Sequence, residues 1–554
     1  MRSYKVRDSL HNDLVAHLLL SRGVEPLLHE QFLTPDFIRD SHDPFLLPDM
    51  HKAVERILSA KKNNEKVAVW SDYDCDGIPG GVMLVEFLRT MGLSVTHYIP
   101  HRHTEGYGLN TEGIDELAAA GVKVMITLDL GTTDVAQIAH ANKKGIDTIV
   151  TDHHLVPSLE HVPEAFALIN PKRPDSKYPF DGLCGAGVAW KLVQALLVKE
   201  RPAGFGEGQE KWLLDLVGIA TLSDMVPLVG ENRMLAHSGL RVMRRGRRPG
   251  IAAMLKLLKI HTASLTEDDI TFMLSPRINA ASRMERPQTA AELLAATTEE
   301  EAMERAIALN HINDERKGLV AATVKEVNKR VSESDLTKSP IIVMGNPNWR
   351  PGILGLVANT LVEAHAKPVF LWGRQGGEEL RGSCRSDGSV NMVELMGAAR
   401  EVFDHFGGHS ASGGFSVLEE RVHELGPKLS AAYESVRNQN AVVEEILLDR
   451  ELELAEVFRA YNNIKQLAPF GVGNTKPLFI FPAVSITTVR AFGKTHNHLG
   501  LTLGQGSAAI EAMSFFATPE SFTKKAVAGE KVDVVGHVEA GWRGGSRIRV
   551  VDIL

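Results

Sequence analysis

Residues 66–77 read KVAVWSDYDCDG, an apolar run followed directly by three aspartates at alternate positions. The run has the length and composition of a short buried strand. Asp72, Asp74 and Asp76 would repel one another in the following turn unless a cation lay between them. An EF-hand calcium loop fits poorly, because Met83 stands where that loop needs a glutamate and a strand precedes the acids. The stretch therefore predicts a metal site, with a solvated turn as the alternative.

The same placement recurs along the chain. Asp129 follows the apolar run Val122–Leu128, and His153 and His154 follow the run Asp147–Thr151. Strands that alternate with helical segments are typical of a doubly wound parallel sheet. In such a sheet the active site lies beyond the carboxyl ends of the strands. We therefore expect an α/β domain in which these side chains meet at one edge.

Carboxylates and an imidazole at one edge predict a metal centre. Asp224, in TLSDMVPL after an apolar helix, supplies a further acid. Hard oxygen donors with an imidazole suit two divalent ions, Mn²⁺ or Mg²⁺. With Asp129 as the bridging carboxylate, the arrangement predicts a two-metal hydrolase, in which one ion supplies a hydroxide for attack and both hold phosphoryl oxygens.

The pattern of expected helices and strands along the sequence predicts four regions of the chain. Residues 297–337 begin with acids, keep helical spacing and carry little Gly or Pro, so they indicate a long linking helix. A second α/β pattern follows at 338–430, and short strands with turns at 435–554 indicate a small β-barrel. Residues 1–296 then hold N-terminal helices and the catalytic domain.

Composition narrows the class of protein. The 554 residues are 44% hydrophobic with a net charge of −8, and no apolar run reaches the roughly 18 residues of a membrane helix. The N-terminus is polar, without the apolar core of a signal peptide. The 3 cysteines are far apart and form no disulfide framework or CxxC zinc site. We expect a cytoplasmic protein with no membrane partner; the negative charge does not exclude a local basic groove for nucleic acid.

Four segments, DYDCDG, TLDLG, TDHH and SDMVPL, resemble the motifs of the DHH phosphoesterase superfamily. PHRHTEGYGLN, SPRINAASRM, RGSCRS, GGHSASGG and APFGVGN are similar to its RecJ family of single-strand-specific exonucleases. The resemblance runs from about residue 20 to the C-terminus. It implies a metal-dependent 5′→3′ exonuclease that releases 5′-mononucleotides from single-stranded DNA in recombination and repair. It also implies that 338–430 is the DHH-associated substrate-binding domain and 435–554 an OB-fold that binds DNA.

The resemblance also implies roles for single residues. The implied metal ligands are Asp72, Asp74, Asp76, Asp129, His153 and Asp224. His154 is implied to lie near the scissile phosphate as a catalytic residue together with Asp129. The implied substrate contacts are Arg102, Tyr107, Arg277, Ser383, Arg385, Gly408 and His409. In the barrel, the cations expected along the path of the strand are Lys524, Lys525, Lys531, Arg543, Arg547 and Arg549.

Two other functions stay open at this point. A DHH phosphoesterase acting on short oligoribonucleotides or cyclic dinucleotides would share the acidic motifs but would have no need of the C-terminal β-domain. A non-catalytic replication scaffold could lose its acids, whereas this chain keeps them. The expected partner is single-stranded DNA; a single-strand-binding protein and a helicase are further candidates.

Overall fold

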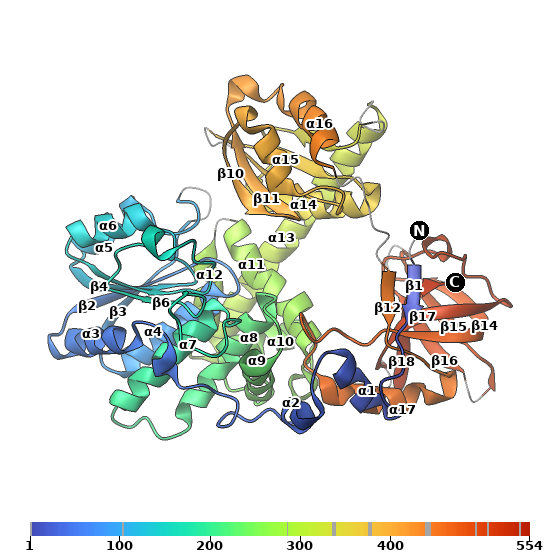
Figure 1. Ribbon diagram of the computed structural model, residues 1–554, viewed down its shortest axis with the longest axis horizontal. Coiled ribbons are helices and arrows are strands. Elements are labelled where there is room, and N and C mark those ends of the chain that lie inside the picture. The colour runs from blue at the N-terminus through green and yellow to red at the C-terminus, as the bar shows by residue number, and fades with distance from the viewer. Residues whose placement is uncertain are drawn as a thin grey trace.

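The computed structural model arranges the chain in three lobes, and one long helix joins the first two (Figure 1). Its description covers residues 3–101, 105–284, 286–334, 339–374, 379–437, 445–493, 496–506, 509–541 and 544–554. Within these ranges no helix combines the length and the apolar character needed to cross a bilayer.

The first lobe is built on a five-stranded sheet whose strands are all parallel. Their order is β3 (Ser94–Tyr98), β2 (Lys66–Ser71), β4 (Val122–Leu128), β5 (Asp147–Thr151) and β6 (Ala167–Ile169). The expected doubly wound α/β fold is therefore confirmed. The central strands β2, β4 and β5 are buried on both faces, which is why they consist of nearly continuous apolar runs.

Helices cover both faces of this sheet (Figure 1). One face carries α3 (Met50–Lys62), α4 (Gly77–Thr90) and α7 (Gly185–Lys199), and the other carries α5 (Thr111–Ala119) and α6 (Val135–Lys143). A helical extension follows: α8 (Leu214–Ser223), α9 (Gly230–Met243), α10 (Pro249–Leu257), a π-helical turn (Asp269–Leu274), α11 (Ser275–Arg283) and α12 (Pro287–Ala295).

The expected linking helix is α13 (Glu299–Ser332), 34 residues long. At a rise of 1.5 Å per residue it extends about 50 Å. Thr298 caps its first turn by accepting a hydrogen bond from the backbone of Glu301, and acids in that turn favour the positive end of the helix dipole. The first half of α13 packs on α10, α11 and α12, and the second half packs on α14 of the next lobe.

The second lobe has a mixed five-stranded sheet in the order β10-β11-β9-β8-β7. Its strands are β7 (Ile342–Gly345), β8 (Val369–Gly373), β9 (Leu380–Arg385), β10 (Phe403–His409) and β11 (Ser412–Val417). Its main helices are α14 (Pro351–His365), α15 (Met392–Ala398) and α16 (Leu425–Val436).

The third lobe contains the expected barrel. The strands β14 (Phe479–Phe492), β15 (His498–Leu503), β16 (Ile510–Ser514), β18 (Ser546–Ile553) and β17 (Lys531–Ala540) pair in that order, and β17 pairs with β14 to close it. Two short strands, β12 (Glu445–Leu448) and β13 (Arg450–Glu451), and the helix α17 (Val457–Ile464) precede it.

The N-terminal segment packs on this third lobe, although the sequence groups it with the catalytic domain. β1 (Ser3–Val6) pairs in parallel with β12, and Leu18 and Leu19 of α1 (Leu14–Ser21) belong to the hydrophobic core of the barrel. The buried Arg233 of α9 joins the lobes by donating hydrogen bonds to main-chain oxygens of residue 32 and residues 467–469.

Candidate active site

The backbone places the predicted acids at one edge of the parallel sheet. The amide of Asp72 donates to the carbonyl of Leu128 at 3.1 Å, and the amide of Asp129 donates to that of Thr151 at 3.0 Å. The first residue after β2 is thus bonded to the end of β4, and the first residue after β4 to the end of β5. The side chains that follow these strands emerge at the same carboxyl edge, as the sequence pattern predicts.

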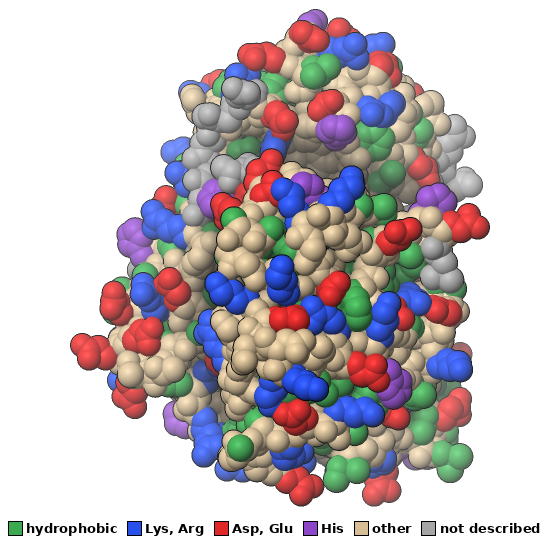
Figure 2. All heavy atoms as spheres, turned by 90° about the vertical axis from the view of Figure 1, so that its left-hand side faces the viewer, with side chains coloured by type: hydrophobic (Ala, Val, Ile, Leu, Met, Phe, Trp, Pro, Cys, Tyr) green, Lys and Arg blue, Asp and Glu red, His purple; other side chains and the backbone are tan. Residues whose placement is uncertain are grey.

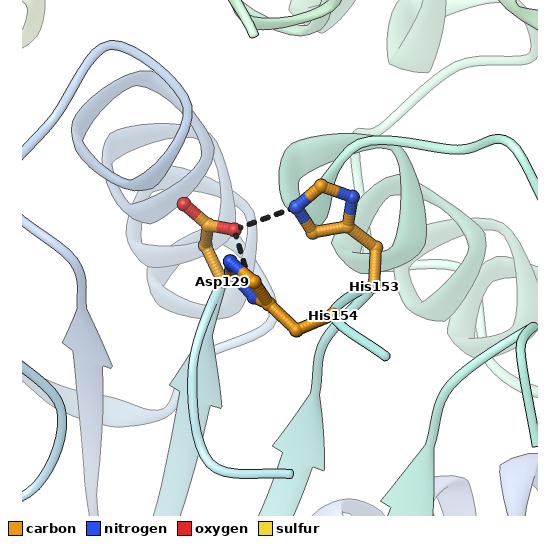
Figure 3. Close-up of side chains that lie close together, drawn as sticks. All are labelled: Asp129, His153 and His154. Carbon is orange, nitrogen blue, oxygen red and sulfur yellow. Dashed lines mark ion pairs between the residues drawn. The ribbon is translucent and has the colours of Figure 1, made fainter. Parts of the chain in front are cut away.

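His153 lies among three of these carboxylates. Its Nε2 is 3.1 Å from Asp129 Oδ1, 3.7 Å from Asp224 Oδ2 and 3.9 Å from Asp76 Oδ2. Figure 3 shows Asp129 facing both His153 and His154. Asp224 comes from the C-terminal end of α8, so a separate helix completes the cluster that the sheet begins.

The donor atoms form three overlapping groups, each with its atoms within 4.8 Å of one another. These are Asp72, Asp74 and Asp129; Asp76, His153 and Asp224; and Asp129, His153 and His154. Asp129 belongs to two of the groups, as a carboxylate between two ions would. All six predicted ligands therefore lie in one cluster.

The electrostatics of the cluster favour a bound cation. Burial, reinforced by the charges of neighbouring aspartates, raises the pKa of Asp76 to about 7 and that of Asp224 to about 8, and raises the pKa of Asp129 well above its ordinary value. Burial lowers the pKa of His153 to about 4, so its imidazole is neutral at pH 7. A neutral imidazole facing carboxylates offers a lone pair rather than a positive charge. The residues present therefore fit divalent metal ions.

Close backbone packing holds these ligands in place, and sequence reasoning did not assign this role. The amides of Gly185 and Ala186 donate to the two oxygens of Asp76 at 2.6 and 2.8 Å. A Cβ at Gly185 would lie 2.6 Å from the Cβ of Asp129, so only glycine fits there. Asp129 itself has a left-handed backbone, φ 65°, which is uncommon for a non-glycine residue and typical of a constrained functional turn.

His154 is oriented by a residue missing from the predicted set. Its Nδ1 pairs with Asp152 Oδ1 at 2.8 Å, and Asp152 also accepts a hydrogen bond from the amide of Thr132. Burial lowers the pKa of His154, but the hydrogen bond and charge of Asp152 outweigh that effect and raise it overall. The sequence contained a signal, since Asp152 directly precedes the two histidines.

The predicted contact Tyr107 lies beside this histidine rather than in the core. Its hydroxyl donates to the carbonyl of Asp129 at 3.2 Å and is 3.4 Å from Nε2 of His154, and the residue is 55% exposed. Arg102 lies outside the described residues. Arg277, on α11, is buried and donates to Asn310 and to the carbonyl of Met273.

The other predicted substrate contacts lie in the second lobe, apart from the metal cluster. Arg385 of β9 and His409 of β10 both pair with Ser412 on the strand between them, and Ser383 lies two residues before Arg385 on β9. A Cβ on Gly408, whose φ is 151°, would lie 2.3 Å from the carbonyl of Ser412. The two β10 residues, Gly408 and His409, are exposed, so this sheet could receive a ligand.

The predicted barrel cations are mostly engaged with acids. Lys524 pairs with Glu530 at 3.3 Å and Lys525 with Glu520 at 2.8 Å. Arg547 and Arg549 both pair with Glu539, at 3.4 and 3.0 Å. Arg543 lies outside the described residues. These pairs give the cations acidic partners within the protein, which the sequence did not indicate.

Models of known families match all three lobes. The DHH family N-terminal domain matches residues 66–221, the DHHA1 domain matches 338–435, and the RecJ OB domain matches 448–551.

Curated relatives match across the lobes. The single-stranded-DNA-specific exonuclease RecJ of Haemophilus influenzae is 30% identical over 489 residues, which is 85% of this chain and 84% of that protein. This chain belongs to the RecJ family. The RecJ of Bacillus subtilis is 31% identical over 534 residues; the match covers 96% of this chain but 66% of the relative.

Solved RecJ structures share the fold. The RecJ of Thermus thermophilus, determined in complex with Mn²⁺, superposes with a TM-score of 0.80 at 25% identity over 98% of this chain and 75% of its own. An exonuclease RecJ bound to manganese gives a TM-score of 0.61 at 28% identity over 70% of this chain and 95% of its own. The expected family, fold class and enzyme class are confirmed.

Proposed function

We propose that this RecJ-family chain is a metal-dependent 5′→3′ single-stranded-DNA exonuclease that releases 5′-mononucleotides in DNA recombination and repair. The observation that carries the proposal is the buried carboxylate cluster at the sheet edge, with Asp129 shared between two groups of donors. The RecJ relatives, which are named single-stranded-DNA-specific exonucleases, support the substrate.

The proposed ligands of two divalent ions, Mn²⁺ or Mg²⁺, are Asp72, Asp74, Asp76, Asp129, His153 and Asp224. Bound there, such ions would activate water and withdraw charge from the phosphate oxygens. Asp129 is the proposed bridge, and the amides of Gly185 and Ala186 fix Asp76 so that its oxygens stay aimed at the cluster.

His154 is the proposed general acid. Asp152 holds its Nδ1 and favours the charged imidazolium, which leaves Nε2 near Tyr107 on the open side of the cluster. From that atom a proton could pass to the leaving oxygen of the shortened strand. Tyr107 keeps its hydroxyl proton at neutral pH, because burial and nearby carboxylates raise its pKa, and it can orient the histidine or a base.

In our proposal the second lobe sets the 5′→3′ direction of digestion, because it binds the 5′ end of the strand. The surface is hollowed between this lobe and the catalytic lobe below it (Figure 2). In our proposal Ser383 and Arg385, with Gly408 and His409 beside them, hold the 5′-terminal phosphate, and Arg277 contacts a phosphate nearer the metal centre. A guanidinium offers a planar fork of donors that suits phosphate oxygens.

The location of the protein in the cell, its partners and its domain boundaries are also part of our proposal. We propose a cytoplasmic enzyme that meets single-stranded DNA, with a single-strand-binding protein and a helicase as candidate partners. We keep the division into 1–296, 297–337, 338–430 and 435–554 as the proposed domains, with the N-terminal residues 3–21 packed on the last of them.

A time course on single strands labelled at the 5′ or the 3′ end, with Mn²⁺ or Mg²⁺ and a duplex control, tests the function. We expect the 5′ label to appear at once as a mononucleotide while the 3′-labelled strand shortens gradually. Early release of the 3′ label would show that digestion starts at the 3′ end and would contradict the proposed direction. Cleavage of only short oligoribonucleotides or cyclic dinucleotides would favour the small-substrate phosphoesterase. No cleavage of any substrate would favour the non-catalytic scaffold.

A further inference from the structure

A groove with a volume of about 780 Å³ lies between α13 and α14. Its floor is apolar, formed by Val320 and Val324 of α13 and Leu356 of α14. Cations on α13 line the same groove: Arg316, Lys317 and Lys325. Asn359 and Thr360 add hydrogen-bonding groups from the facing helix. An apolar floor with a cationic rim is unusual for a linking helix that only separates two domains.

Among the residues that the structure describes, the cations of the groove form no ion pair, unlike other cations on α13. Arg305 pairs with Glu292 at 3.2 Å and Arg330 with Glu326 at 3.6 Å. By contrast, Nε of Arg316 is buried and has no hydrogen-bond partner among the described residues. Burial and the charge of Arg277 lower the pKa of both Arg316 and Lys317, so these cations repel one another. The neighbouring acid is Asp314, which is close enough to attract Lys317.

Neighbouring residues lead from the metal centre toward the groove. Ser223, next to Asp224, hydrogen-bonds Ser275 of α11 through the two hydroxyls at 2.5 Å. Arg277 follows two residues later on α11, close enough to Arg316 for its charge to lower the pKa of that guanidinium. Positive charge thus continues from the catalytic lobe onto α13.

We propose that this groove binds a stretch of the single strand away from the bond that is cut, with phosphates on Arg316, Lys317 and Lys325 and bases over the apolar floor. This inference rests on the proposed function and names a further binding surface for the same substrate. The ten residues from Arg316 to Lys325 spread these cations along about 13.5 Å of helix, long enough to face the phosphates of a few nucleotides. A small anion would leave the floor uncovered, whereas a strand uses both the floor and the rim.

The test compares two double variants. K317E/K325E reverses two exposed cations of the groove. K123E/K329E reverses two exposed lysines elsewhere, Lys123 on the sheet and Lys329 at the end of α13. Binding of a labelled oligothymidylate is measured by fluorescence anisotropy at several salt concentrations in EDTA, with thermal melting as the check of folding.

We expect K317E/K325E to bind at least tenfold more weakly than K123E/K329E. Since each lost phosphate contact on a single strand lowers the salt slope by about 0.7, the slope should fall by at least about 1.4. Equal affinity and equal salt slope in the two variants would overturn the proposal that the groove binds the strand. Because binding is measured without hydrolysis, that result is distinct from failure of the proposed function, which would show as wild-type protein that binds the strand yet does not cut it with metal present.

Discussion

The carboxyl edge of the catalytic sheet and the surface of the C-terminal barrel both carry charges that sequence reasoning assigned to function. At the sheet edge, aspartates are buried against one another and against a neutral imidazole. On the barrel, Lys524, Lys525 and Arg549 each lie within ion-pair distance of a glutamate. The two regions resemble one another as clusters in the sequence and differ in whether the protein supplies the opposite charge.

That difference shows which charges call for a ligand. Like charges held together by burial destabilise the folded chain, and a cation from outside relieves the strain. Exposed charges that are already paired contribute little to either stability or binding. By this criterion the carboxylate cluster and the cations of the α13 groove are the charges left for a ligand, whereas most of the predicted barrel cations already have a partner.

The largest expected effect follows from Asp129→Asn. The change removes one ligand from both groups of donors at once, so hydrolysis of single strands should fall to background. The same change removes a buried charge that neighbouring aspartates repel, so the metal-free protein should melt at a higher temperature. Activity assays and thermal melting in EDTA test both effects. Asp115→Asn, at an exposed surface acid, is the control, and near-normal turnover by folded Asp129→Asn would refute the shared-ligand assignment.

The second effect is a dependence of stability on pH. The folded-state pKa values of Asp76 and Asp224, about 7 and about 8, lie above the ordinary 3.8, so the folded protein holds protons that the unfolded chain releases. Stability should therefore fall as pH rises through this range, by up to about 1.4 kcal/mol per pH unit for each proton.

His153 changes the stability of the folded protein in the opposite direction, since it lowers stability as pH falls, and it does so only at lower pH. Its pKa is lowered from 6.5 to about 4, so it costs stability below about pH 6.5 and is neutral in both states above that value. Melting between pH 6.5 and 8 removes the contribution of His153. His154, whose pKa is raised, adds a decline of the same sign, so the melting is carried out in a His154→Gln background to leave the carboxyl groups. In EDTA the melting temperature should decline across this window, and Mn²⁺ should raise it more at pH 8 than at pH 6.5. A flat profile in EDTA would contradict the repulsion inferred here.

A smaller effect is expected from Arg385→Ala in the second lobe. If its guanidinium holds the terminal phosphate, the loss of a charged hydrogen bond costs about 1.5–3 kcal/mol, or roughly tenfold or more. The ratio of kcat/KM for 5′-phosphorylated over 5′-hydroxyl strands should fall by that factor. Arg381→Ala, on the same strand β9, is the matched control. An equal loss on both substrates would indicate that Arg385 only supports the fold.

The smallest effect belongs to the barrel. Because Lys524 and Lys525 are paired with glutamates, K524A/K525A should change the free energy of unfolding by less than about 1 kcal/mol. The salt slope for strand binding should change less than in K317E/K325E. A fall in slope as large as in the groove variant would place the strand on the barrel and erase the distinction between paired and unpaired cations.

Much of the fold was predictable because its determinants are local. The strands β2, β4 and β5 have the bounds that their apolar runs predict, and α13 begins where Thr298 can cap it. The turn residues after these strands identified the catalytic edge, since the carboxyl ends of parallel strands share one side of the sheet.

Other features depend on contacts between residues distant in the sequence. Pairing of β1 with β12 joins the two ends of the chain, and no periodicity within either segment indicates it. The hydrogen bonds from the amides of Gly185 and Ala186 to Asp76 depend on where α7 packs against the edge of the sheet.

The sequence by itself determined the strands, the linking helix, the acids at the sheet edge and the family motifs, because short-range spacing encodes each of them. Only the tertiary structure decided which charges keep a partner. Glu539 pairs with Arg547 and Arg549 from the neighbouring strand β17, whereas the charge of Arg277 on α11 lowers the pKa of Arg316 on α13. The physical reason is that a charge acts through its distance and burial, and both are fixed when separate elements pack together.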